Sequence, residues 1–112
     1  MTDTDLTSCR IVWERRDDVQ ILDVREQWEW DAGHIDGAVH IPLNDVLAGK
    51  TAGLDPALPV VAYCKTGPRS EVATLMLQAR GFQAHNMEGG SEAWCREGLP
   101  FVDTEGKPGR VV

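Results

Sequence analysis

The sequence predicts an α/β fold in which a parallel sheet is covered by helices on both faces. Short apolar runs alternate with segments of helical periodicity along the chain, an order typical of parallel sheets. The run Val60–Tyr63 is continuously apolar, as expected of a strand buried on both faces. With 112 residues, 42% of them hydrophobic, the chain has the length and composition of one globular domain with its own core.

Each element follows from its local composition. β-branched and other apolar residues predict strands at 19–24, 38–41, 60–63 and, more weakly, 83–87. Apolar residues at helical spacing predict a helix at 70–80 and shorter helical segments at 27–32, 44–48 and 92–97. Glycines follow several of these helices, as is common at helix ends, and Ser91 is the expected N-cap of the last one.

Charge and composition argue against several classes of partner. The formal net charge is −7 and the pI is near 4.8, with basic residues scattered along the chain. Nucleic-acid-binding proteins carry a basic patch or stripe, so we expect no DNA, RNA or anionic membrane as a partner. No apolar stretch approaches the ~20 residues of a membrane-spanning helix, and the N-terminus lacks the apolar region of a secretory signal.

Cysteine usage predicts free thiols in a reducing cytoplasm. Cys9, Cys64 and Cys95 are odd in number and widely spaced, and they form no Cys-x-x-Cys pair. Neither a zinc knuckle nor a thioredoxin motif is therefore expected, and His40 and His85 have no metal-ligand partners in the sequence. We expect no metal site and expect Cys9 and Cys95 to be packing residues.

Cys64 lies where parallel sheets form their sites. It ends the strand 60–63 and precedes the helix 70–80, at the carboxyl edge of the predicted sheet. Loop amides and the helix N-terminus direct partial positive charge to this position, and Lys65 and Arg69 add formal charge. Such surroundings lower the pKa of cysteine from ~8.5 to roughly 3.5–7.5. The sequence therefore predicts an anionic nucleophile at Cys64.

The cysteine alone is weak evidence, because a lone cysteine at a strand end is more often a small buried hydrophobic residue. The combination of strand, cysteine, basic glycine-containing loop and helix favours the nucleophile. In this loop Gly67 permits a positive φ, while Pro68 fixes the turn and contributes no amide donor.

Three ordered motifs resemble the signatures of rhodanese-like domains. Ile21–Leu43 (ILDVREQWEWDAGHIDGAVHIPL) is similar to the first signature, Tyr63–Ser70 (YCKTGPRS) to the active-site loop and Gly81–Trp94 (GFQAHNMEGGSEAW) to the third. The resemblance implies a three-layer α/β domain with a five-stranded, mostly parallel sheet and helices on both faces. We expect this domain at residues 6–102, flanked by flexible ends at 1–5 and 103–112.

The resemblance also implies an enzyme, a sulfurtransferase of the thiosulfate:cyanide class. Cys64 would attack the outer sulfur of thiosulfate or of a persulfide donor and carry that sulfur as a covalent persulfide. A thiol, on a small molecule or a protein, or cyanide would then accept the sulfur. No metal or organic cofactor is implied, and the partners are a small anionic sulfur donor and a thiol acceptor.

The remaining loop residues are expected to bind the sulfur donor: Lys65, Thr66, Gly67, Pro68, Arg69 and Ser70. Lys65 and Arg69 would hold the sulfonate end of thiosulfate, with Arg69 able to do so through two hydrogen bonds. Thr66 and Ser70 would donate from their hydroxyls. The alternatives are a solvated charge for Lys65 and, for Arg69, an ion pair with a carboxylate such as Glu71.

Some polar residues of the first signature are expected to be structural. Asp23 and Arg25 end the first strand near the loop, where a carboxylate–guanidinium pair would brace it. His34 belongs to the Gly-His-Ile turn of the same signature and is expected to stabilise that turn.

Other functions of the same fold remain as alternatives. The domain would act as a persulfide carrier if it took sulfur from one protein and passed it to a biosynthetic partner. A non-catalytic interaction module is disfavoured, because such domains generally lack the cysteine. A phosphatase or arsenate reductase is disfavoured because Cys-x5-Arg loops place arginine one position further from the cysteine than Arg69 lies from Cys64. A monomer is expected.

Overall fold

The computed structural model describes residues 5–112; residues 1–4, which belong to the predicted flexible N-terminus, lie outside the described residues. Its central sheet contains four parallel strands in the spatial order β3-β1-β4-β5. The strands are β1 (Gln20–Asp23), β3 (Val39–His40), β4 (Val60–Tyr63) and β5 (Ala84–Asn86). The most apolar strand, β4, therefore lies inside the sheet, between β1 and β5, as its composition predicts.

Helices cover the sheet on both faces. They are α1 (Cys9–Glu14), α2 (Gln27–Ala32), α3 (Leu43–Leu47), α4 (Pro68–Ala79) and α5 (Gly90–Arg96). Side chains of β4 alternate between two buried clusters, as the two-residue period of a strand requires. Val61 and Tyr63 pack with Trp94 of α5, whereas Val60 and Ala62 pack with Leu77 of α4. The α/β class and the two covered faces are thus confirmed.

Two further strands pair with each other outside the central sheet. β2 (His34–Ile35) and β6 (Phe101–Val102) form an antiparallel pair. The central sheet consequently has four strands rather than the expected five. Neither β2 nor β6 was predicted, and His34 and Ile35 were instead expected to belong to a turn.

The last helix begins differently from the prediction. α5 starts at Gly90, and its N-cap is Gly89, which adopts a left-handed conformation with φ 78°. Ser91 is therefore not the N-cap, and its amide instead donates to the carbonyl oxygen of Cys64 over 2.8 Å. The prediction followed the N-cap preference of serine, whereas the left-handed Gly89 lets the helix begin two residues earlier than expected.

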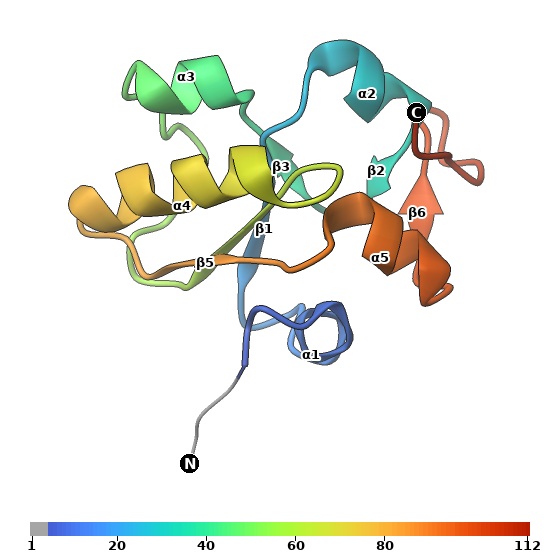
Figure 1. Ribbon diagram of the computed structural model, residues 1–112, viewed down its shortest axis with the longest axis horizontal. Helices are drawn as coiled ribbons and strands as arrows, with labels where there is room; N and C mark the ends of the chain where they lie inside the picture. The colour runs from blue at the N-terminus through green and yellow to red at the C-terminus, as the bar shows by residue number, and fades with distance from the viewer. Residues whose placement is uncertain (1–4) are drawn as a thin grey trace.

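The segment expected to be a flexible tail, residues 103–112, lies against the domain. The amide of Gly109 donates to the carbonyl oxygen of Phe101 over 2.9 Å, and that of Arg110 donates to Ala32 over 3.0 Å. A side chain at Gly33 would collide with Phe101 and with the backbone of Arg110. The C-terminus consequently lies beside α2 and β2 (Figure 1).

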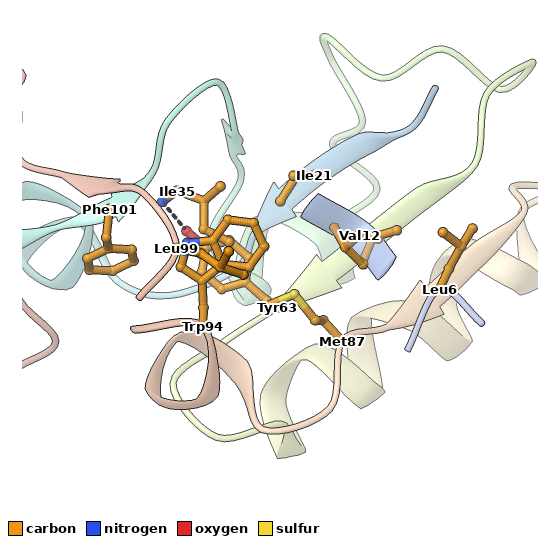
Figure 2. Packing of buried hydrophobic residues seen from close by; sticks show 10 residues of the cluster. Leu6, Val12, Ile21, Ile35, Tyr63, Met87, Trp94, Leu99 and Phe101 are labelled. Atoms are coloured by element: carbon orange, nitrogen blue, oxygen red, sulfur yellow. Dashed lines mark hydrogen bonds between the residues drawn. The ribbon is translucent and has the colours of Figure 1, made fainter. Parts of the chain in front are cut away.

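A buried polar network lies under the carboxyl end of β1 and β4. Asp23 and Arg25 form an ion pair of 2.7 Å with neither side chain exposed, and Arg25 also donates to the carbonyl oxygen of Gly33. The Tyr63 hydroxyl donates to Asp23 over 2.6 Å. It also accepts the amide of Ile35 over 3.1 Å, the hydrogen bond drawn as a dashed line in Figure 2. Burial, with Asp23 beside it, raises the pKa of Tyr63 well above its ordinary value, so the phenol stays neutral and donates.

Within residues 5–112, none of the helices has both the length and the apolar character needed to cross a bilayer. The longest, α4, has 12 residues.

Replacing Tyr63 with phenylalanine tests this network. Tyr63→Phe keeps the packed ring but removes one hydrogen bond from Asp23, whose Oδ2 still accepts from Arg25, and leaves the buried Ile35 amide without this partner, so the free energy of unfolding should fall by about 1–3 kcal/mol. Urea unfolding followed by tryptophan fluorescence measures the loss. An unchanged unfolding midpoint would show that the hydroxyl contributes only packing.

Candidate active site

Cys64 is held between β4 and α4 in a short loop whose backbone requires glycine. Gly67 is the N-cap of α4 with φ 132°, a region that side chains other than glycine rarely adopt. Pro68 is the first residue of the helix, a position where its missing amide hydrogen costs no helical hydrogen bond. The loop therefore turns sharply and brings the first amides of α4 back toward the sulfur.

The start of α5 holds the other side of the loop. The amides of Ser91 and Glu92 donate to the carbonyl oxygens of Cys64 and Lys65, over 2.8 and 3.1 Å. A Cβ atom on Gly90 would collide with both of these carbonyl oxygens. The glycine pair ahead of α5 therefore lets this helix approach the loop backbone closely.

Hydrogen-bond donors surround the sulfur. The Gly67 amide lies 3.0 Å from Sγ of Cys64, and the Ser70 hydroxyl lies 3.4 Å from it. Burial alone raises the pKa of Cys64, but the Ser70 hydroxyl and the amides of Ser70, Gly67 and Thr66 outweigh it, so the pKa is lowered from its ordinary value. The geometry therefore favours a thiolate, and neutral donors rather than the two cations are its main stabilisers.

Arg69 is occupied by a carboxylate from another helix. Its guanidinium forms two hydrogen bonds to Glu29 of α2, of 2.7 and 3.0 Å, and the Glu29 side chain is only 4% exposed. The expected alternative of an ion pair is thus what the structure contains, although the partner is Glu29 and not Glu71. Burial raises the pKa of Glu29, but Arg69 and the amide of Glu26 outweigh this effect and lower it.

Lys65 and Thr66 lie on the outer side of the loop. Lys65 is partly exposed, Thr66 is exposed, and within residues 5–112 Lys65 forms no ion pair. Lys65 is therefore the cation of the loop that is available to an anionic ligand.

The sulfur itself is sheltered, since Cys64 is only 1% exposed. A shallow pocket of about 310 Å³ lies beside the loop and is lined by Thr66, Gly67, Pro68, Glu71, Asn86, Glu88 and Gly89. Two carboxylates, Glu71 and Glu88, thus border the approach to the loop.

The sequence did not single out two residues that the structure brings to the site. Glu29 is paired with Arg69, and Asn86, at the end of β5, contacts both Ser70 and Gly67. The only signal for Asn86 is its position at the carboxyl edge of the parallel sheet, the edge at which sites form.

Residues 9–97 match the sequence profile of the family described as "Rhodanese-like domain". The chain belongs to this family. Its sulfurtransferase relative from Allochromatium vinosum is 34% identical over 91 residues, covering 80% of this chain and 84% of that protein. The crystal structure of a rhodanese-related protein from Thermoplasma volcanium has a TM-score of 0.79 at 30% identity, covering 85% of this chain and 94% of that one.

A larger relative contains this domain as one part. The chain is 40% identical over 82 residues to the probable adenylyltransferase/sulfurtransferase MoeZ of Mycobacterium tuberculosis, which covers 71% of this chain but only 21% of the relative. The chain therefore spans about a fifth of the length of that protein. The family and these sulfurtransferase names support sulfur transfer as the general activity of the rhodanese-like domain described here.

The titration of Cys64 tests whether the hydrogen-bond donors around the sulfur stabilise its thiolate. Its alkylation rate, followed on the Cys64 peptide by mass spectrometry, should rise with a midpoint below the ~8.5 of an ordinary thiol, because the donors stabilise the thiolate. Ser70→Ala should raise the midpoint by about one unit. Thr74→Val is the matched control, since this hydroxyl on the same helix donates to the carbonyl oxygen of Ser70 and not to the sulfur. A midpoint near ~8.5 in the unmodified protein would show that these donors do not stabilise the thiolate.

The ion pair between Glu29 and Arg69 makes a pH-dependent contribution to stability. Because the folded-state pKa of Glu29 is lowered, its contribution is present above the ordinary glutamate pKa of ~4.3 and is lost as the pH falls through the folded-state value. Glu29→Gln should therefore lower the free energy of unfolding at neutral pH by about 1–2 kcal/mol and by progressively less below about pH 4. Urea unfolding at a series of pH values measures this, with Glu71→Gln as the control. Equal losses at all pH values would exclude the ion pair as their cause.

Proposed function

We propose that this domain is a sulfurtransferase that carries sulfane sulfur as a persulfide on Cys64. The observation that carries the proposal is the ring of donors around a cysteine at the carboxyl end of a central parallel strand. The proposed cycle uses no resident metal or organic cofactor. The three cysteines of the protein are free thiols, which suits a reducing cytoplasm.

The reaction has two nucleophilic steps. With thiosulfate as donor, the Cys64 thiolate attacks the outer sulfur, the bond between the two donor sulfurs breaks, and sulfite leaves with its electron pair. The product is the anionic persulfide of Cys64. An acceptor thiolate then attacks the terminal sulfur, takes it as its own persulfide and restores the Cys64 thiolate; cyanide would leave as thiocyanate. Ping-pong kinetics follow from this order.

Loop donors suit the anions of this cycle. The persulfide bears its charge on the terminal sulfur, within reach of the amides of Thr66, Gly67 and Ser70 once the chain of two sulfurs extends from Cys64. Because Arg69 is paired with Glu29, Lys65 is the cation that would hold the sulfonate end of thiosulfate. This assignment narrows the sequence prediction, which gave both cations that role.

A second candidate, a persulfide relay between proteins, is favoured by the charge beside the loop. Glu71 and Glu88 line the adjoining pocket, and these carboxylates repel a dianion such as thiosulfate. A protein donor or acceptor with basic residues around its thiol would meet no such barrier. In this case the chemistry at Cys64 is the same, but turnover with thiosulfate is slow.

Intact mass spectrometry separates these candidates from a domain without sulfur chemistry. After brief incubation with thiosulfate, the protein should gain one sulfur atom and lose it on addition of cyanide, whereas Cys64→Ser should gain none.

Lys65→Ala should raise the Michaelis constant for thiosulfate by about tenfold, the effect of losing one charged contact. Arg80→Ala is a matched control, since this cation lies at the far end of α4.

The relay makes a different prediction from thiosulfate chemistry. If thiosulfate leaves the mass unchanged, incubation with a cysteine desulfurase and free cysteine should still load one sulfur atom on Cys64. If neither donor loads sulfur on Cys64, the domain forms no persulfide. The non-catalytic interaction module is then the better explanation.

A further inference from the structure

The Ser70 hydroxyl has three neighbours but only one proton. Its Oγ lies 3.4 Å from the sulfur of Cys64, 3.0 Å from the carbonyl oxygen of Gly67 and 2.5 Å from Oδ1 of Asn86. A serine hydroxyl donates one hydrogen bond, so it cannot serve all three acceptors at once. A bond to Asn86 therefore removes from Cys64 one of the donors that stabilise its thiolate.

A second contact sets the orientation of the Asn86 amide. Its Nδ2 donates to the carbonyl oxygen of Gly67 over 3.2 Å. The reversed amide would place two oxygen atoms against each other at this point with no proton between them, so the network assigns the orientation. Oδ1, which only accepts, consequently faces Ser70, and this contact is the shortest of the three.

We propose that Asn86 is a positioning residue that competes with Cys64 for the proton of Ser70. When Cys64 is a neutral thiol, or when its sulfur is bonded to the transferred sulfur, Ser70 donates to Asn86. When Cys64 is a thiolate, the hydroxyl rotates toward the sulfur and gives up Asn86. The proposal rests on the proposed function only in that Cys64 is the nucleophile.

This competition has a chemical use. A thiolate that is stabilised more strongly is a weaker nucleophile, because nucleophilicity falls with the pKa of the thiol. Because Ser70 must give up its hydrogen bond to Asn86 before it can donate to the sulfur, the thiolate gains less net stabilisation and stays more reactive. Once Cys64 has taken up the transferred sulfur, the inner sulfur of its persulfide is uncharged. Ser70 can then donate to Asn86 again without removing stabilisation from a charged sulfur.

Charged groups around the loop do not replace this role. They are Lys65 and Arg69 beside Cys64, Glu71 on α4, Glu88 after β5, Glu92 on α5 and Glu29 on α2. Each acts on Cys64 through space, and none of their side chains has a described hydrogen bond to Ser70 or Asn86. Their influence should be the same whichever acceptor Ser70 serves.

The test is a double-mutant cycle on the titration of Cys64. In full-length protein carrying Cys9→Ser and Cys95→Ser, the ultraviolet absorbance of the thiolate is followed against pH. Asn86→Ala should lower the Cys64 pKa by about half a unit to one unit, because Ser70 is released to the sulfur. Ser70→Ala should raise the pKa, and the double variant should titrate like Ser70→Ala, since no proton remains to compete for.

Matched variants separate competition from loosening of the strand. Gln78→Ala removes another side-chain amide that donates to a backbone carbonyl, that of Ala84, and should leave the pKa unchanged. Asn86→Leu, which keeps the volume, should reproduce the shift of Asn86→Ala. An unchanged or raised pKa in both Asn86 variants, or a shift that persists in the absence of the Ser70 hydroxyl, would overturn the proposal. Because the titration needs no sulfur donor, this result is independent of whether the persulfide forms.

Discussion

The hydrogen bond from the Gly67 amide to the sulfur of Cys64 is the constraint on which the site depends. It closes the loop onto its own nucleophile, and it exists only because Gly67 adopts a positive φ and α4 begins directly afterwards. The closed loop directs its amide hydrogens inward, so its own carbonyl groups need partners elsewhere. α5 provides these partners with two amides, and Gly90, which has no side chain, allows the approach. Two helices from different parts of the chain thus share one short loop.

The buried network of Asp23, Arg25 and Tyr63 supports this arrangement from beneath. Tyr63 directly precedes Cys64, and its hydroxyl links the end of β1 to β2. Breaking one member of such a network leaves a buried charge or polar group uncompensated, which is costly in the low-dielectric interior. The end of β4 is therefore held in place by the hydrogen bonds of Tyr63, and this also fixes the position of the neighbouring Cys64.

Much of the site could be predicted from local sequence, but its long-range partners could not. The apolar run 60–63 predicts a central strand and places Cys64 at its carboxyl end, and Gly67 and Pro68 predict the turn. Glu29 lies 40 residues from Arg69 and Asn86 lies 16 residues from Ser70, so only the folded sheet brings each pair together. The N-cap at Ser91 was wrong because the helix already begins at Gly90 after the left-handed Gly89, and the Ser91 amide bonds to the Cys64 loop, a contact that local preference does not indicate.

The pairing of Arg69 with Glu29 changes which forces act on the sulfur. A guanidinium bound by a carboxylate is largely neutralised, so the sulfur is stabilised mainly by amide and hydroxyl dipoles. The backbone amides among these donors suit a cycle in which the charge moves from the inner sulfur to the terminal sulfur and back, because donors held by the backbone need no reorganisation between steps. An unpaired cation close to the sulfur would hold the thiolate more tightly and make it less reactive toward a donor. We therefore interpret the ion pair as part of the loop's support, with Lys65 as the charge that remains to meet an incoming anion.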